Sequence, residues 1–268
     1  MYRIHRFRSA FCFLTIALWP VVGWAGTNAV SEHPPQVEPF DFATPQTLTG
    51  TIYEMGPPPE KILFHFRRTA IRMGDIVHVE RIYTCPDGSA AAVENVVYQS
   101  GQLVSFEMKE FQANVSGSIE ITPVPTNPAC QKISIGYAHN LNPPKGTPKN
   151  LLPDTVIDDT LYPFMLAHWD DLMRGDAPKF HFVSLEWKCT FNFRLVKTGE
   201  RVQAGRTFEL IKMEPTSLLL SHVLKPLSFT VEKDGARHIV SYTGRTTPRV
   251  KKGNTWKYLD AKTVFDWK

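Results

Sequence analysis

The sequence predicts a mainly β protein built on one strongly curved antiparallel meander sheet, a half-barrel or open barrel, with a helix in the middle of the chain. Three observations support this fold class. Apolar and polar residues alternate in many short runs, Gly-containing turns separate the runs, and one central segment has helical spacing. Alternation with a period of two is typical of strands that bury one face.

The first 25 residues have the three parts of a secretory signal peptide. Arg3, Arg6 and Arg8 give a positive start, residues 10–22 form an apolar run, and residues 23–25 are a small-x-small cleavage signal. The run is too short to predict a membrane span, and the cleavage point has no cysteine for a lipid anchor. We expect a mature chain without a membrane span, located in the periplasm of a two-membrane bacterium or secreted.

The net charge of the chain is +4, and three arginines of the signal segment account for most of it, leaving +1 for the mature part. Nucleic-acid binding requires a clustered basic face. The most basic segment, residues 244–257, contains turn chemistry and is interpreted as a solvated hairpin. No nucleic-acid partner is therefore expected.

The segment that follows the signal peptide has a distinct composition. Residues 26–46 are rich in Pro and lack periodicity, which predicts an extended leader. Residues 47–268 are interpreted as a single β-rich domain, with a loop over residues 139–154 between its first strands and the helix.

Four runs show the strand alternation most clearly. Their apolar members are Ile62, Phe64 and Phe66; Val104, Phe106 and Met108; Phe191, Phe193 and Leu195; and Leu227, Phe229 and Val231. Gly-containing turns are expected at residues 85–89, 98–102, 196–200, 232–236 and 250–254. Short turns force neighbouring strands to run antiparallel, so we expect a meander of roughly 10–12 strands. So wide a sheet must curl, because strand twist accumulates and open edges invite aggregation.

A concave apolar face needs a cover, and residues 159–174 predict one: a central amphipathic helix. Apolar side chains recur at three- and four-residue spacing, Asp158 or Asp159 can cap the start, and Gly175 stops the last turn. His168, Asp170 and Asp171 are expected on its solvated flank, with no metal site. A second short helix is possible over residues 215–224, and the alternative there is a bulged linker that carries core leucines.

The mature part has three cysteines, so at most one internal disulfide can form. Cys85 and Cys130 both stand at expected loop positions near a proline, whereas Cys189 opens a strand. If a bridge forms, we expect Cys85–Cys130. No pair has C-x-x-C spacing, and no cofactor or metal is indicated.

The order of these features resembles a group of uncharacterised exported bacterial proteins of this length. The features are a "PDG" hairpin, the helix "DDTLYPFMLAHWDDLMRGD", "FNFRLV", "MEPTSLLLSHVLKPLSFTVEKDG" and "YTGRT". More loosely, a curved sheet with a helical cover is similar to the half-barrels of the Lol-type lipoprotein carriers, which hold acyl chains. No motif of that family matches here residue by residue.

Catalytic motifs are missing from the sequence: there is no G-x-S-x-G elbow, no H-E-x-x-H and no Gly-rich phosphate loop. We therefore favour a carrier or sensor of an apolar or lipid-like molecule and name no catalytic residue. One alternative is a structural or partner-binding cell-envelope protein in which the same residues form a closed core, and a second is a cavity-based hydrolase or isomerase. The residues expected to line a ligand cavity are Phe64, Phe66, Phe106, Phe164, Trp169, Phe191, Phe193 and Phe229.

Overall fold

The structure is a computed structural model that describes residues 46–57, 60–222 and 224–267. The expected signal peptide, residues 1–25, and all but the last residue of the expected leader lie outside the described residues. The division into signal, leader and one domain remains a prediction.

Fifteen strands make up most of the described chain, and they lie in a single sheet. The first eight are β1 (Gln46–Glu54), β2 (Ile62–Met73), β3 (Ile76–Thr84), β4 (Ala90–Gln99), β5 (Gln102–Glu110), β6 (Val115–Val124), β7 (Asn127–Ala138) and β8 (Pro148–Asn150). The others are β9 (Thr155–Val156), β10 (Lys179–Ser184), β11 (Cys189–Gln203), β12 (Arg206–Pro215), β13 (Leu227–Glu232), β14 (Ile239–Lys252) and β15 (Thr255–Trp267).

Strands that are neighbours in the sheet are consecutive in the chain, and the one exception is the pairing of the first strand, β1, with the last strand, β15, in the middle of the sheet. Its order is β8-β7-β6-β5-β4-β3-β2-β1-β15-β14-β13-β12-β11-β10-β9. All neighbours are antiparallel except the short parallel pair β9 and β10. The sheet is open and curved rather than closed into a barrel, which confirms the predicted fold class. The strand count exceeds the expected 10–12 partly because β8 and β9 are only three and two residues long.

Four of the five expected turns contain a glycine with positive φ: Gly88, Gly101, Gly235 and Gly253. The fifth is wrong, because residues 196–200 lie inside β11, where the register with β12 shifts between Lys197 and Gly199. Gly199 therefore belongs to a bulge, which accommodates one extra residue without reversing the chain. The reversal comes later, at Ala204 and Gly205, which both have positive φ as a two-residue hairpin turn requires.

The helices are α1 (Asp158–Ala167), α2 (Trp169–Arg174) and α3 (Leu218–Ser221). The single helix expected over 159–174 is thus divided at His168, whose backbone leaves the helical region while hydrogen bonds continue on both sides. Residues 161–165 are all buried, so α1 is enclosed more completely than a surface helix with one solvated face. No helix among these described residues has the length and apolarity needed to cross a bilayer.

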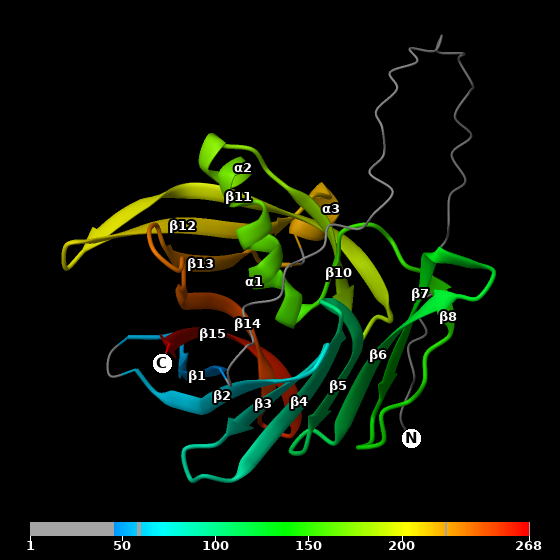
Figure 1. Ribbon diagram of the computed structural model, residues 1–268. Helices are drawn as coiled ribbons and strands as arrows, with labels where there is room; N and C mark the ends of the chain where they lie inside the picture. The colour runs from blue at the N-terminus through cyan, green and yellow to red at the C-terminus, as the bar shows by residue number, and fades with distance from the viewer. Residues whose placement is uncertain (1–45, 58–59, 223, 268) are drawn as a thin grey trace, which may run out of the picture. The chain divides into compact units, whose positions relative to one another are not determined.

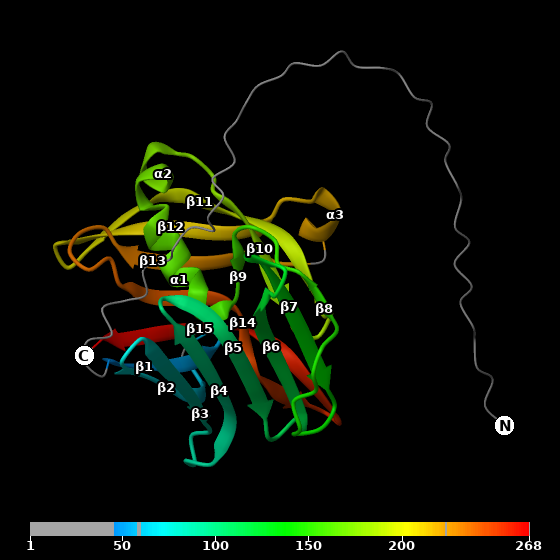
Figure 2. The ribbon, with the colours of Figure 1, turned by 45° about the vertical axis from the view of Figure 1, so that its right-hand side comes forward.

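Helix α1 lies inside the curve of the sheet, between β12–β14 and β3–β5 (Figure 1, Figure 2). It caps its own first turn through Thr160, whose Oγ1 accepts a hydrogen bond of 2.9 Å from the Ile157 N–H. The caps expected from Asp158 and Asp159 are therefore wrong, because Ile157 is the N-cap and both aspartates are in the first turn. These carboxylates are free to contact the sheet instead.

Three apolar clusters fill the concave side of the sheet. The first joins α1 and α2 to β10–β14, and its members include Phe164, Trp169 and Phe193. The second joins β2–β7 to residues around β9 and β10, and the third lies beneath β1–β4 and β15. Most of the concave face is therefore closed by packing.

A buried ion pair ties β14 to the opposite part of the sheet. Arg249 donates from Nη1 to Glu110 Oε1 at 2.9 Å, and its Nη2 donates to the hydroxyls of Tyr137 and Tyr258, both at 2.7 Å. Glu110 is on β5 and Tyr137 on β7. One arginine thus holds together strands that are not neighbours in the sheet.

The helix expected over 215–224 is present only as the single turn α3. Leu218 and Leu219 are 82% and 83% exposed, so they do not form the buried stripe of a longer amphipathic helix. Leu224 and Leu227 do pack against the first cluster, as the alternative of a linker with core leucines requires.

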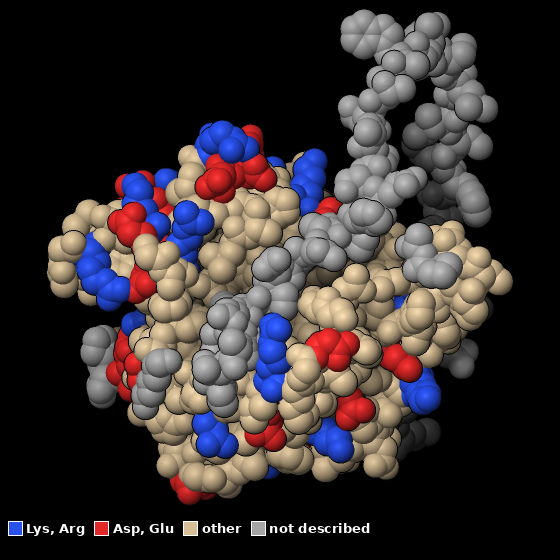
Figure 3. Space-filling model, viewed as in Figure 1, with Lys and Arg blue, Asp and Glu red and all other residues tan. Residues whose placement is uncertain are grey.

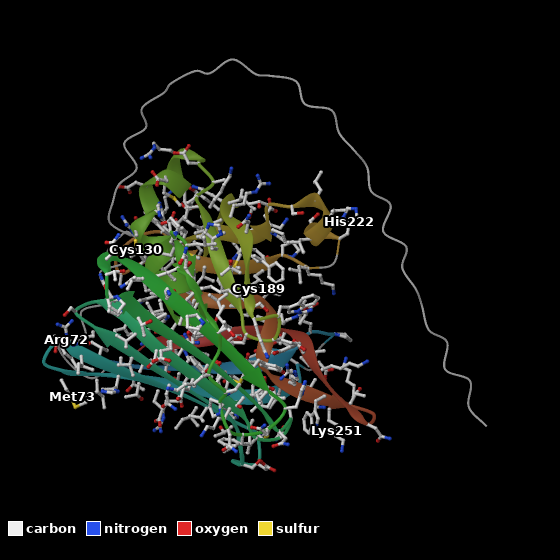
Figure 4. All side chains as sticks on the ribbon, turned by 90° about the vertical axis from the view of Figure 1, so that its right-hand side faces the viewer. Arg72, Met73, Cys130, Cys189, His222 and Lys251 are labelled. Carbon is white, nitrogen blue, oxygen red and sulfur yellow. The ribbon has the colours of Figure 1, made fainter. Side chains whose placement is uncertain are left out.

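The cysteine pairing expected from the sequence is wrong. Cys85, Cys130 and Cys189 are all free. Cys85 directly follows β3, whereas Cys130 lies in β7 (Figure 4), four strand positions away. That separation is roughly 19 Å across the sheet, well beyond the distance of about 7 Å between Cα atoms that a disulfide spans.

Candidate ligand cavity

A row of charged side chains crosses three neighbouring strands on the concave face. Arg68 of β2 pairs with Arg81 of β3, and Arg81 pairs with Glu94 of β4. All three are at the inward positions of their strands and are buried, at 7%, 8% and 3% exposure. Buried charges require partners, and α1 supplies them.

Asp159 of α1 is the centre of this network. Its carboxylate accepts hydrogen bonds from Arg68 Nε at 2.9 Å and Nη2 at 3.1 Å, from Arg81 Nη2 at 2.6 Å, and from the Tyr98 hydroxyl at 2.6 Å. Arg81 also donates to Glu94 at 3.1 Å and contacts Asp158. The start of α1 is therefore fixed to β2, β3 and β4 by charge-assisted hydrogen bonds.

The two buried carboxyl groups respond oppositely to this environment. Burial acts to raise the pKa of Asp159, but Arg68 and Arg81 outweigh it and hold that pKa well below its usual range. Burial raises the pKa of Glu94 to about 7, because Arg81 offsets only part of the desolvation and two aspartates lie nearby. Asp159 is thus the permanent anion of the network, whereas Glu94 takes up a proton near neutral pH.

Beside this network lies a cavity of about 190 Å³. Its floor is the middle of the sheet, where β1 pairs with β15, and its roof is the first two turns of α1. Aromatic side chains dominate its wall: Phe66, Tyr83, Tyr162, Phe182, Phe229, Tyr242, Phe265 and Trp267. Five aliphatic residues complete the apolar part.

Polar groups also line the cavity. They include Asp158, Arg245 and Thr246 together with the buried arginines. The Asp158 side chain is 60% exposed, and Arg245 is exposed. The cavity therefore combines a large apolar wall with accessible charges of both signs, as pockets for amphiphilic small molecules do.

The turn between β13 and β14 supports two aromatic residues of the cavity wall. The Tyr162 hydroxyl donates to the carbonyls of Ala236 and Arg237 at 3.2 and 3.0 Å. Trp267 donates from Nε1 to the carbonyl of Ile239 at 2.8 Å, and His238 stacks on its ring at 4.3 Å between centroids. Two aromatic residues of the wall are thus held in place by the turn between these strands.

The residues predicted from the sequence to line a cavity are divided between this wall and the packed core. Phe66 and Phe229 line the cavity. Four of the others are fully enclosed in apolar clusters, Phe191 is half-buried against the first cluster, and Phe64 is buried in the third. The enclosed four are Phe106, Phe164, Trp169 and Phe193.

The sequence prediction missed the charged part of the site. Arg68, Arg81 and Glu94 occur at the apolar positions of alternating runs, two residues from Phe66, Tyr83 and Val96 respectively. A charge at an inward strand position is a signal of a buried partner, and it could have indicated this site.

His168 and Asp171 do not contribute to the cavity. His168 Nδ1 lies 3.0 Å from Asp171 Oδ2, and Asp171 also pairs with Arg174 at the far end of α2. No group of three metal-ligating side chains occurs within the part of the chain that the structure describes. Charges of both signs are interspersed on the surface seen in Figure 3.

Fold and site together define an open, curved β sheet that holds a helix and a small aromatic cavity on its concave side. No family model matches the chain, and no curated protein matches it. Among solved structures it is similar to a domain described as an outer membrane lipoprotein-sorting protein domain, from Vibrio parahaemolyticus. That comparison has 7% identity and a TM-score of 0.24, covering 83% of this chain and 82% of that one.

It is also similar to a DUF1329 family protein from Desulfovibrio piger, with 11% identity and a TM-score of 0.22 over 84% of this chain and 82% of that one. Likeness at this level assigns neither a family nor a function to the chain.

Proposed function

We propose that this protein is an exported carrier or sensor that binds one apolar, lipid-like molecule in the cavity beneath α1. The observation that supports this most is the composition of the cavity wall, in which aromatic and aliphatic side chains outnumber polar ones on an otherwise closed concave face. Such a wall favours an apolar ligand because removing apolar surface from water is favourable. The export signal of residues 1–25 supports a periplasmic or secreted location.

The size of the cavity limits how the ligand is held. Its volume of about 190 Å³ is below the roughly 300–1,000 Å³ of typical ligand pockets but far above the space of one water molecule, about 30 Å³. A long chain would therefore be enclosed only in part. Its apolar end would lie against Phe66 and Phe229, and its polar end would lie near Asp158 and Arg245.

A fluorescent fatty acid such as cis-parinaric acid tests this proposal. Thr263 is 5% exposed, lines the cavity floor, and pairs with Ile52 on one side and Tyr242 on the other. Thr263→Phe fills the cavity, so we expect saturable binding to wild type and a loss of affinity of about tenfold or more in the variant. Thr243→Phe is the matched control, because Thr243 pairs with Lys262 on the opposite face of the same two strands.

A second function, a structural or partner-binding envelope protein, is favoured by one specific observation. Six of the eight phenylalanine and tryptophan residues expected in the cavity do not line it, and all eight are packed in or against apolar clusters. If wild type binds the probe without saturation, or if Thr263→Phe binds as wild type does, this second function is the better account.

A further inference from the structure

Helix α3 exposes two leucines to solvent. Leu218 and Leu219 are 82% and 83% exposed, more than any other large apolar side chain among the described residues. They are adjacent in the chain, on a single helical turn that follows β12. Scattered apolar residues are normal on a protein surface, but two neighbouring leucines exposed to this degree require a separate explanation.

Backbone hydrogen bonds hold this turn in place. Thr216 donates its N–H to the Asn192 carbonyl at 3.0 Å, and Ser221 donates to the Ser217 carbonyl at 3.0 Å. The next leucines along the chain, Leu224 and Leu227, pack against the first apolar cluster, and Leu227 also lines the cavity. One leucine-rich segment therefore extends from the exposed turn to the cavity wall.

The place of the turn makes it accessible. His222, which directly follows α3, lies at the outer edge of the described residues in Figure 4. Leu218 and Leu219 are consequently held outward on a fixed support, where a large partner surface can reach them.

Charge around the turn suits a lipid surface. Residues 215–227 contain no Asp or Glu. At the base of the turn Arg194 and Lys212 share Glu214, and beyond it Lys225 pairs with Asp260. Three cations therefore face two carboxylates, an excess of one positive charge. A neutral or anionic membrane surface meets no electrostatic barrier there.

The small area of the turn favours a lipid surface over a protein as its partner. A stable protein interface buries at least about 1,000 Å², which two leucine side chains and their immediate neighbours do not supply. Peripheral attachment to a bilayer needs only that apolar side chains enter roughly 5–10 Å into the boundary between headgroups and acyl chains.

We propose that α3 docks the protein on a lipid bilayer, with Leu218 and Leu219 inserted among the lipid chains. This is a different property from ligand binding in the cavity and does not depend on it. Attachment by two leucines is weak and reversible, which suits a protein that visits a membrane rather than stays on it.

Flotation with vesicles of phosphatidylethanolamine and phosphatidylglycerol tests the proposal on the exported full chain. We expect wild type to float with the vesicles, and Leu218→Ser/Leu219→Ser to lose about tenfold or more of that partition. Val202→Ser is the matched control, because Val202 is an exposed apolar residue (71%) near the hairpin end of β12, opposite to α3. The length of β12 places it about 30 Å away, so its partition should equal that of wild type.

Three results would overturn the proposal. Wild type could fail to float, the double variant could float as wild type does, or the double variant could convert a wild-type dimer to a monomer, which would make the turn a protein interface. Thr263→Phe should float as wild type does, so failure of ligand binding and failure of docking are distinguishable. The leucine and Val202 variants should keep the wild-type Tm, since the substituted residues are exposed.

Discussion

Asp159→Asn removes the one carboxylate on which the charged network of α1 depends. The side chain is 2% exposed and accepts four hydrogen bonds, from Arg68, Arg81 and Tyr98. The amide has nearly the same shape, but it leaves two buried arginines without their shared charge and turns an N–H₂ group toward donors. Removing one partner of a buried ion pair costs about 3–5 kcal/mol, a large part of the 5–15 kcal/mol typical of a domain.

Urea denaturation followed by tryptophan fluorescence measures this cost, and Asp158→Asn is the matched control. Asp158 is the neighbouring residue and also contacts Arg81, but its side chain is 60% exposed, so its loss should cost about 0–1 kcal/mol. The contrast between adjacent aspartates separates burial of the charge from its mere presence at the start of the helix.

The dependence of this cost on pH has a definite sign. The folded-state pKa of Asp159 lies well below the value in the unfolded chain, so its contribution to stability is complete above about pH 4 and is lost as the pH falls further. The difference between wild type and Asp159→Asn should therefore shrink as the pH falls below about 4. A difference under about 1 kcal/mol at pH 7, or one that grows as the pH falls below about 4, would refute this account of the network.

Three further predictions concern the surroundings of the site. Because the folded-state pKa of Glu94 is about 7, wild type should lose stability relative to Glu94→Gln as the pH rises from 5 to 8, and urea titrations at both values check this. Trp169→Ala removes a core side chain that is 4% exposed and should cost about 3–5 kcal/mol, whereas Asp171→Ala should leave the unfolding midpoint unchanged. Alkylation of the exported protein without reduction should label three thiols, Cys85, Cys130 and Cys189, and a disulfide in the peptide map would contradict the strand order.

The strand pattern could be predicted from the sequence because alternation and turn chemistry are local properties. Phe64 and Phe66 are buried while His65 and Arg67 are exposed, as expected. The turn expected at residues 196–200 was wrong because a glycine in a bulge and a glycine in a hairpin have the same local sequence signal. Only the register between β11 and β12 distinguishes them.

The site was harder to predict because it depends on distant segments meeting. Whether an inward phenylalanine lines a cavity or joins the core depends on where α1 and β10 cross the concave face. Phe182 of β10 and Phe265 of β15 line the cavity although their runs gave no sign of it. The role of Asp159 likewise follows from strands more than 60 residues earlier in the chain, so local capping rules assigned it to the wrong partner.

Native mass spectrometry of the protein, purified gently from the compartment to which its host exports it, tests the central claim most directly. The carrier account predicts a population carrying one noncovalent adduct with the mass of a lipid or another apolar metabolite. Thr263→Phe should lose this adduct and Thr243→Phe should keep it. A wild-type protein that carries no adduct after gentle purification and also fails to bind the fluorescent fatty acid would contradict the account, because the cavity would then be only an imperfection in a closed core.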